Sequence, residues 1–112
     1  MSNSPDIAFV KTAEKIGQIK AQGVDFTRQH EVTHQFFSFH ENREFRKALE
    51  ELGFKVSERD ESPGLEARRP EHLSVAALRS TVEQLCRIAD RYAAEYDGWD
   101  LTANLNQKLE EK

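Results

Sequence analysis

The longest run of periodic apolar positions lies in the second half of the chain and predicts a helix. Apolar side chains recur there at steps of three and four residues over about six turns. These residues are Val75, Leu78, Val82, Leu85, Ala89, Tyr92 and Tyr96. Ser74 can cap the start of this helix, and Asp97-Gly98 is a typical stop. Because the helix is apolar along a single stripe, it must lie on another part of the fold.

Two more helices are predicted earlier in the chain. The second has one stripe at helical spacing and ends at Gly53; the stripe consists of Phe45, Ala48, Leu49 and Leu52. The first begins at Ser4-Pro5-Asp6, weakens at Gly17 and stops at Gly23. Its spaced positions are Phe9, Ala13, Ile16 and Lys20. Since this apolar face is thin, we expect the first helix to be appended to the domain rather than part of its core.

Four strands are predicted between and after these helices. Residues 31–40 alternate with large apolar residues on both sides, as expected of a central strand. A short strand at 54–57 runs into the charged stretch 57–61, which suits a sheet edge. The turn Ser62-Pro63-Gly64 then leads into a partner strand at 65–69. Alternation at 99–105 predicts the last strand.

The order of elements is therefore a helix followed by β-α-β-β-α-β. Two right-handed helical crossovers within one sheet give an α+β ferredoxin-like sandwich, a four-stranded antiparallel sheet with two helices on one face. Its first and third strands are expected to be central, and its second an edge. The chain divides accordingly into a helical extension at 1–23, the sandwich domain at 24–105 and a polar tail at 106–112.

Composition excludes several classes of protein. The 112 residues carry a net charge of −4, which opposes unassisted binding to a phosphate backbone, so direct binding of nucleic acid is not expected. No stretch approaches the roughly 20 apolar residues that span a bilayer, so no membrane association is expected. The single cysteine, Cys86, cannot form an internal disulfide and fits a reducing compartment. We expect a cytoplasmic protein with one domain.

The spacing of the histidines does not predict a metal site. His30, His34 and His40 share one side of the first strand. At the rise of a strand, however, His30 and His34 lie about 13 Å apart, and His34 and His40 about 20 Å apart. A zinc ion holds each imidazole nitrogen at about 2 Å, so no two of them can share one ion. His72 lies beyond the hairpin, and no metal ligand is predicted.

Residues that could support catalysis are also missing. Cys86 lies mid-helix among apolar residues, where burial raises the pKa of a thiol, so we interpret it as structural. No Gly-rich phosphate loop, GxSxG or HExxH motif is present. We expect neither an enzyme nor a cofactor. A small-molecule-binding domain stays open as an alternative and would require an enclosed polar pocket.

A second alternative concerns the aromatic residues of the first strand. Phe36, Phe37 and Phe39 are of the type that stacks single-stranded bases on a sheet. The neighbouring strand at 65–69 adds no aromatic residue, and the acidic balance opposes RNA. Packing in the core or against a partner is therefore favoured, while an RNA-binding module that uses Phe37 and Phe39 stays open.

Three stretches carry a resemblance to a known family. The most specific is Tyr96-Asp97-Gly98-Trp99 after the long helix; Glu31-Val32-Thr33-His34 and Leu52-Gly53-Phe54-Lys55-Val56 are weaker. With these stretches, the chain resembles the regulator-of-ribonuclease-activity-B family over roughly residues 24 to 103. The resemblance implies a ferredoxin-like domain that inhibits ribonuclease E, the endoribonuclease that starts bacterial messenger-RNA decay, by docking on it. Members of the family extend into a strongly acidic C-terminal segment, whereas residues 106–112 here are short and mixed in charge.

The sequence therefore predicts a non-catalytic regulatory protein that binds a protein partner, plausibly an endoribonuclease. The residues expected to contact the partner are His34, Phe37, Phe39, Asp97 and Trp99. The doubly apolar first strand and the spare N-terminal helix also suggest a surface that needs cover. Either the N-terminal helix folds back over it, or a second copy forms a homodimer.

Overall fold

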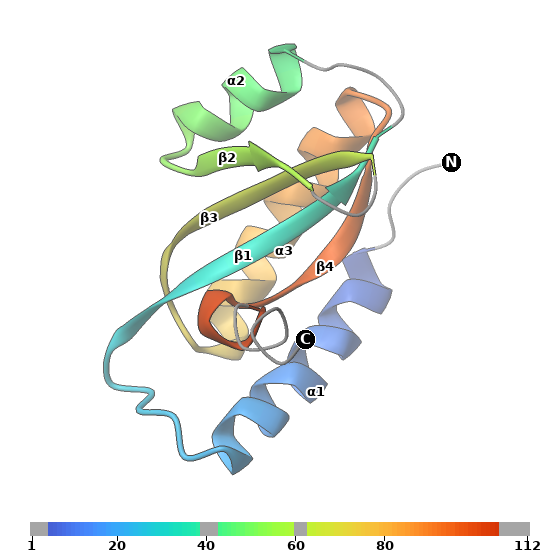
Figure 1. Ribbon diagram of the computed structural model, residues 1–112. Helices are drawn as coiled ribbons and strands as arrows, with labels where there is room; N and C mark the ends of the chain where they lie inside the picture. The colour runs from blue at the N-terminus through green and yellow to red at the C-terminus, as the bar shows by residue number, and fades with distance from the viewer. Residues whose placement is uncertain (1–4, 39–42, 60–62, 106–112) are drawn as a thin grey trace.

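The computed structural model describes residues 5–38, 43–59 and 63–105, which fold into a four-stranded sheet covered by helices (Figure 1). The elements follow one another as α1 (Pro5–Ala21), β1 (Gln29–Phe37), α2 (Arg43–Glu51), β2 (Lys55–Glu58), β3 (Gly64–His72), α3 (Val75–Arg91) and β4 (Glu95–Leu101). The strand order is β2-β3-β1-β4, and the paired strands are antiparallel. This confirms the ferredoxin-like sandwich, with β1 and β3 central and β2 at an edge.

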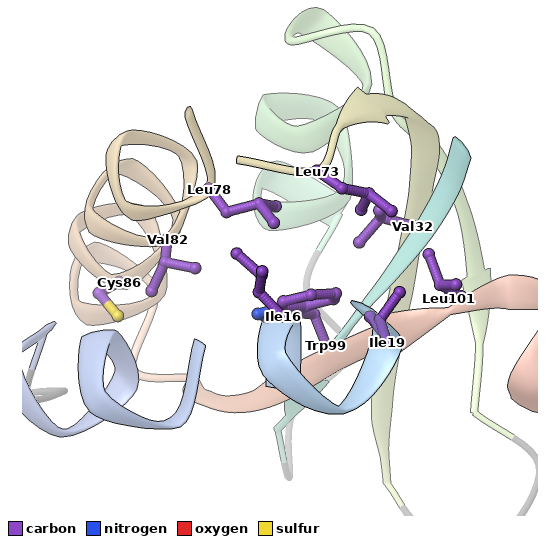
Figure 2. Close-up of a cluster of buried hydrophobic side chains, with 9 residues drawn as sticks. All are labelled: Ile16, Ile19, Val32, Leu73, Leu78, Val82, Cys86, Trp99 and Leu101. Atoms are coloured by element: carbon purple, nitrogen blue, oxygen red, sulfur yellow. The ribbon is translucent and has the colours of Figure 1, made fainter. Parts of the chain in front are cut away.

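The helices lie on one face of the sheet, and two hydrophobic clusters fill the space between. In Figure 1, α3 runs behind the sheet, α2 lies beside β2, and α1 lies beside β4. One cluster joins α1, α3 and the sheet and is drawn in Figure 2; it comprises Ile16, Ile19, Val32, Leu73, Leu78, Val82, Cys86, Trp99 and Leu101. The other joins α2, α3 and the sheet and comprises Phe36, Phe45, Leu49, Phe54, Leu65, Ala67, Leu85, Ala89 and Ala94. Tyr96 packs against both clusters, so the core is continuous.

The first helix is part of this core, contrary to expectation. Ile16 and Ile19 of α1 are 8% and 1% exposed and belong to the cluster in Figure 2. The predicted stripe was rotated: Ala13 is exposed, and the buried line is Thr12, Ile16 and Ile19. The threonine that begins that line hid the apolar pattern. The helix thus folds back on its own domain, but on the face that carries α2 and α3, so it does not cover the other side of β1 as expected.

The third helix ends earlier than its apolar spacing predicts. It stops at Arg91, and the chain reverses through Ala93, which adopts a left-handed φ of 55°. The backbone N–H of Ala94 donates to the carbonyl of Ala89 at 2.8 Å, which closes the helix. Tyr96 therefore belongs to β4 rather than to the helix. It matched the helical period because it faces the same core from the strand.

The last strand lies four residues earlier than predicted, at Glu95–Leu101 rather than at 99–105, and residues 102–105 are helical. The side chain of Asp100 accepts hydrogen bonds from the backbone N–H of Leu101 at 2.8 Å and from the amide of Asn104 at 3.2 Å. These bonds favour a turn directly after the strand. The hydroxyls of Thr33 and Thr102 lie 2.7 Å apart, so this turn covers part of the face opposite the three helices.

The start of β3 requires a glycine. A Cβ at Gly64 would lie 1.9 Å from the carbonyl oxygen of Phe36, and the φ of Gly64 is 140°. The predicted turn at residues 62–64 falls partly outside the described residues. Its glycine allows β3 to approach β1 closely where the two strands begin to pair, at Phe37 and Gly64.

Candidate docking surface

The five residues predicted to contact a partner occupy different environments. His34 and Trp99 are buried, with exposed fractions of 0% and 8%. Phe37 is partly exposed on the face opposite the three helices, and Asp97 is exposed at the edge strand β4. Phe39 lies outside the described residues. Of the four described residues, only Phe37 and Asp97 therefore reach the surface, while His34 and Trp99 lie within the core.

His34 is the centre of a buried polar chain across three strands. Its Nε2 lies 2.7 Å from a carboxylate oxygen of Glu71 on β3, and its Nδ1 lies 2.8 Å from the hydroxyl of Tyr96 on β4. A neutral ring that donates from Nε2 and accepts at Nδ1 satisfies all three groups. Burial raises the pKa of Tyr96 well above its ordinary value, with smaller contributions from Cys86 and Glu71, so the tyrosine keeps its proton. Since His34 is fully enclosed, its role is to hold the strands together.

Trp99 connects the edge strand to the first helix. Its indole N–H donates to the hydroxyl of Thr12 on α1 at 3.1 Å, and its ring packs in the cluster of Figure 2. The tryptophan thus packs against α1 as well as α3, which the sequence did not predict. Gly98 precedes it with a φ of 110°, as its place in the motif requires.

An open groove of about 480 Å³ runs between α1 and β4, next to these residues. We call it the α1/β4 groove; its walls include Ile7, Lys11 and Lys15 of α1 and Asp97, Gly98 and Asp100 of β4. Tyr96, Trp99 and Cys86 also contribute to its lining. The groove therefore combines an apolar inner surface with charged groups at the rim, as protein interfaces commonly do.

The charges along the α1/β4 groove are partly paired. Asp97 accepts from Arg59 at 2.9 Å, and its side chain is 50% exposed. Lys15 lies 3.4 Å from Asp100, which fixes α1 against the edge strand. Lys11 forms no ion pair with any residue that the structure describes. One cation and one half-exposed carboxylate are thus available to a partner.

The sequence did not identify the two lysines. They are four residues apart on α1 and so share one side of the helix, but nothing in the sequence shows that this side faces β4. The only sequence signal for the groove was the Asp97-Gly98-Trp99 motif, which forms its opposite wall.

Cys86 is positioned as an unreactive thiol. It is 2% exposed, and burial, with a smaller contribution from Asp90, raises its pKa to about 11. From an ordinary value of 9.0, this shift lowers the thiolate fraction at neutral pH about 100-fold. Cys86 in the folded protein should react with a disulfide reagent such as DTNB at least about 100-fold more slowly than in urea. Equal rates in both conditions would contradict this placement.

The described residues offer neither a metal site nor a membrane-spanning helix. No group of three or more histidine, cysteine or acidic side chains could hold a metal ion there. His30 instead bonds the backbone carbonyl of Asp25 at 2.6 Å, and His40 lies outside the described part of the chain. None of the described helices combines the length and the apolar character needed to cross a bilayer.

Comparison with known proteins identifies the family. A search of curated proteins finds no match to this chain. The family model described as "Regulator of ribonuclease activity B" matches residues 11–101. The match spans β1 to β4, most of α1 and every described residue that the sequence predicts to contact a partner. The chain therefore belongs to the regulator of ribonuclease activity B family.

Proposed function

We propose that the protein is a non-catalytic regulator that binds an endoribonuclease of the ribonuclease E type and lowers its activity. The family match over residues 11–101 is the observation that carries this proposal, because the family is described as a regulator of ribonuclease activity. The structure of the described residues fits a role in binding. The polar chain of Glu71, His34 and Tyr96 is enclosed, whereas the α1/β4 groove is open. We propose the cytoplasm as the site of action, since messenger-RNA decay occurs there and the lone Cys86 fits a reducing compartment.

We propose the α1/β4 groove as the surface that contacts the ribonuclease. It unites Asp97, a residue expected to bind the partner, with Lys11, a cation without an ion pair among the described residues. Aromatic side chains beneath a charged rim are typical of the few residues that dominate binding energy. The groove also lies beside β4, whose outer edge pairs with no other strand of the described sheet.

The experiment compares two charge reversals in a cleavage assay with purified ribonuclease and a labelled RNA. Asp97→Arg should weaken inhibition about 10- to 100-fold, because reversing a charge that faces the partner sets like charges against each other. The variant replaces a half-exposed ion pair with Arg59 by a contact between two cations, so its free energy of unfolding should fall by about 1–2 kcal/mol.

Glu50→Arg provides the matched control, because Glu50 is exposed on α2, away from the groove, and the net charge changes equally. It should inhibit like the unmodified protein. If both variants inhibit normally, the groove is not the docking surface. If the unmodified chain leaves RNA cleavage unchanged and captures no ribonuclease, the regulatory function itself is wrong.

Direct binding of RNA through Phe37 is the competing function. Phe37 is only partly exposed, and it pairs across the sheet with Gly64 and Glu95, neither of which offers a stacking surface. The docking proposal therefore predicts no binding to RNA alone.

A further inference from the structure

The outward side of α1 presents an apolar line that no described part of the chain covers. Ile7 and Val10 are 59% and 62% exposed, and among the described residues the only other exposed large hydrophobic residue is Val75, at 40%. Glu14 lies four residues after Val10, and Gly17 lies three residues after Glu14; both are exposed. At helical spacing, these four residues lie along one stripe, opposite the buried line of Thr12, Ile16 and Ile19. We call this stripe the α1 seam.

Within the part of the chain that the structure describes, nothing requires a glycine at position 17. It lies inside α1, its φ is not positive, and a Cβ there would meet nothing within 4 Å. A glycine in a helix interior costs about 0.5–1 kcal/mol relative to alanine. The missing side chain does, however, allow another helix to approach closely. Contacts within the described fold therefore do not explain this glycine.

We propose that the α1 seam binds the α1 seam of a second copy, with the two helices antiparallel about a two-fold axis. The seam has its large side chains in its N-terminal half and its glycine in its C-terminal half. An antiparallel pair places Ile7 against the partner's Gly17 and Val10 against the partner's Glu14. The two-fold axis repeats both contacts, so the seam is complementary to itself.

Charge supports the same arrangement. Lys11 follows Val10 and would lie beside the partner's Glu14, and neither residue forms an ion pair within the described structure. A parallel pair would instead bring Glu14 against the partner's Glu14 and Ile7 against the partner's Ile7. Like charges at such short range oppose association, and two large residues would face each other while two glycines left a gap.

The seam from Ile7 to Gly17 spans about 15 Å of helix, which is short for a permanent interface. We therefore infer a weak dimer whose population rises with protein concentration. This inference does not rest on the proposed binding to a ribonuclease, although Ile7 and Lys11 belong to both surfaces. Val10 does not line the α1/β4 groove, so it can be changed to test one proposal without the other.

Engineered cysteines test the register directly, because a disulfide traps even a weak pair. Two single variants, Ile7→Cys and Gly17→Cys, are mixed under mild oxidation; Cys86 is buried in both. A disulfide-linked dimer that contains one copy of each variant should form several times faster than the product of either variant alone. Ile7→Cys mixed with Val75→Cys controls for random collision, since Val75 is also exposed. Linkage no faster than in this control would overturn the proposal, and so would preferential linkage of Ile7→Cys to itself.

Sedimentation equilibrium gives the second readout on the full chain. Val10→Glu should raise the dissociation constant of the dimer at least about tenfold, whereas Val75→Glu should leave it unchanged. Gly17→Ala should raise the midpoint of thermal unfolding of the monomer while it weakens the dimer. If Gly17 affected only the stability of the monomer, Gly17→Ala would not weaken the dimer. An unmodified protein that stays monomeric at every concentration would contradict the inference.

Discussion

Replacing His34 with leucine should lower the free energy of unfolding by about 3 kcal/mol. The change removes the hydrogen bond of 2.7 Å that His34 donates to the carboxylate of Glu71, which stays in the core at 7% exposed, and it removes the hydrogen bond between His34 and the hydroxyl of Tyr96. Losing the partner of a buried hydrogen-bonding group costs about 1–3 kcal/mol, and more where the group is charged. We expect a combined loss of about 3 kcal/mol, because Arg69 lies 3.7 Å from Glu71 and keeps part of the compensation. Urea unfolding followed by circular dichroism measures the difference.

Two variants separate this explanation from a simple packing defect. Tyr96→Phe removes the hydrogen bond to His34 and leaves the bond between His34 and Glu71 in place, so it should cost only about 0.5–1.5 kcal/mol. Adding Glu71→Leu to His34→Leu removes the stranded carboxylate and should recover part of the lost stability. If the double variant is less stable than His34→Leu by the full cost of Glu71→Leu alone, the two residues are not coupled and the polar chain has no such role.

Replacing Trp99 with alanine should destabilise the protein by about 3–5 kcal/mol. The indole is 8% exposed and packs with Ile16, Val82 and Leu101 in the cluster of Figure 2, so its removal leaves a large cavity. It also ends the hydrogen bond to Thr12 and weakens the attachment of α1. The measurement is again the free energy of unfolding in urea.

Trp99→Phe is the informative comparison, because it keeps most of the apolar volume and loses the indole N–H. Thr12→Val removes the same hydrogen bond from the side of α1 and should cost about 1 kcal/mol. A loss below about 1 kcal/mol for Trp99→Ala would show that the tryptophan does not support the core as described.

The sheet could be predicted from the sequence because each strand carries its own local signal. Alternation in β1 and the charged residues around β2 are enough to place one strand in the centre and the other at an edge. The rule that helical crossovers are right-handed then leaves one order of strands in the sheet, and the observed order β2-β3-β1-β4 agrees with it.

The boundaries of α3 and β4 could not be predicted, because Tyr96 faces the core from β4 at a position that also fits the helical spacing of α3. A side chain can face the core at helical spacing from a helix or from the strand that returns beneath it. Residues 92–94 separate the two elements, and the left-handed residue among them is Ala93, which gives no sequence signal. The same limit applies to Asp100, whose side chain ends the strand through bonds that a pattern of alternation does not show.

The candidate site was harder to predict, since it depends on contacts between distant segments. His34 meets Glu71 and Tyr96, which are 37 and 62 residues away in sequence, so its burial cannot be seen locally. Asp97 was identified through its motif, whereas Lys11 and Lys15 reach the groove only because α1 packs against β4. That packing depends on Thr12, a polar residue in an otherwise apolar line.

The central claim is that the protein acts by binding the ribonuclease itself and neither RNA nor a substrate. Titration of the purified, RNA-free ribonuclease with the full chain in a calorimeter tests it directly, alongside titration of single-stranded RNA at low salt. We predict saturable binding to the ribonuclease and none to RNA. Binding to RNA that Phe37→Ala weakens, together with no binding to the ribonuclease, would contradict the account.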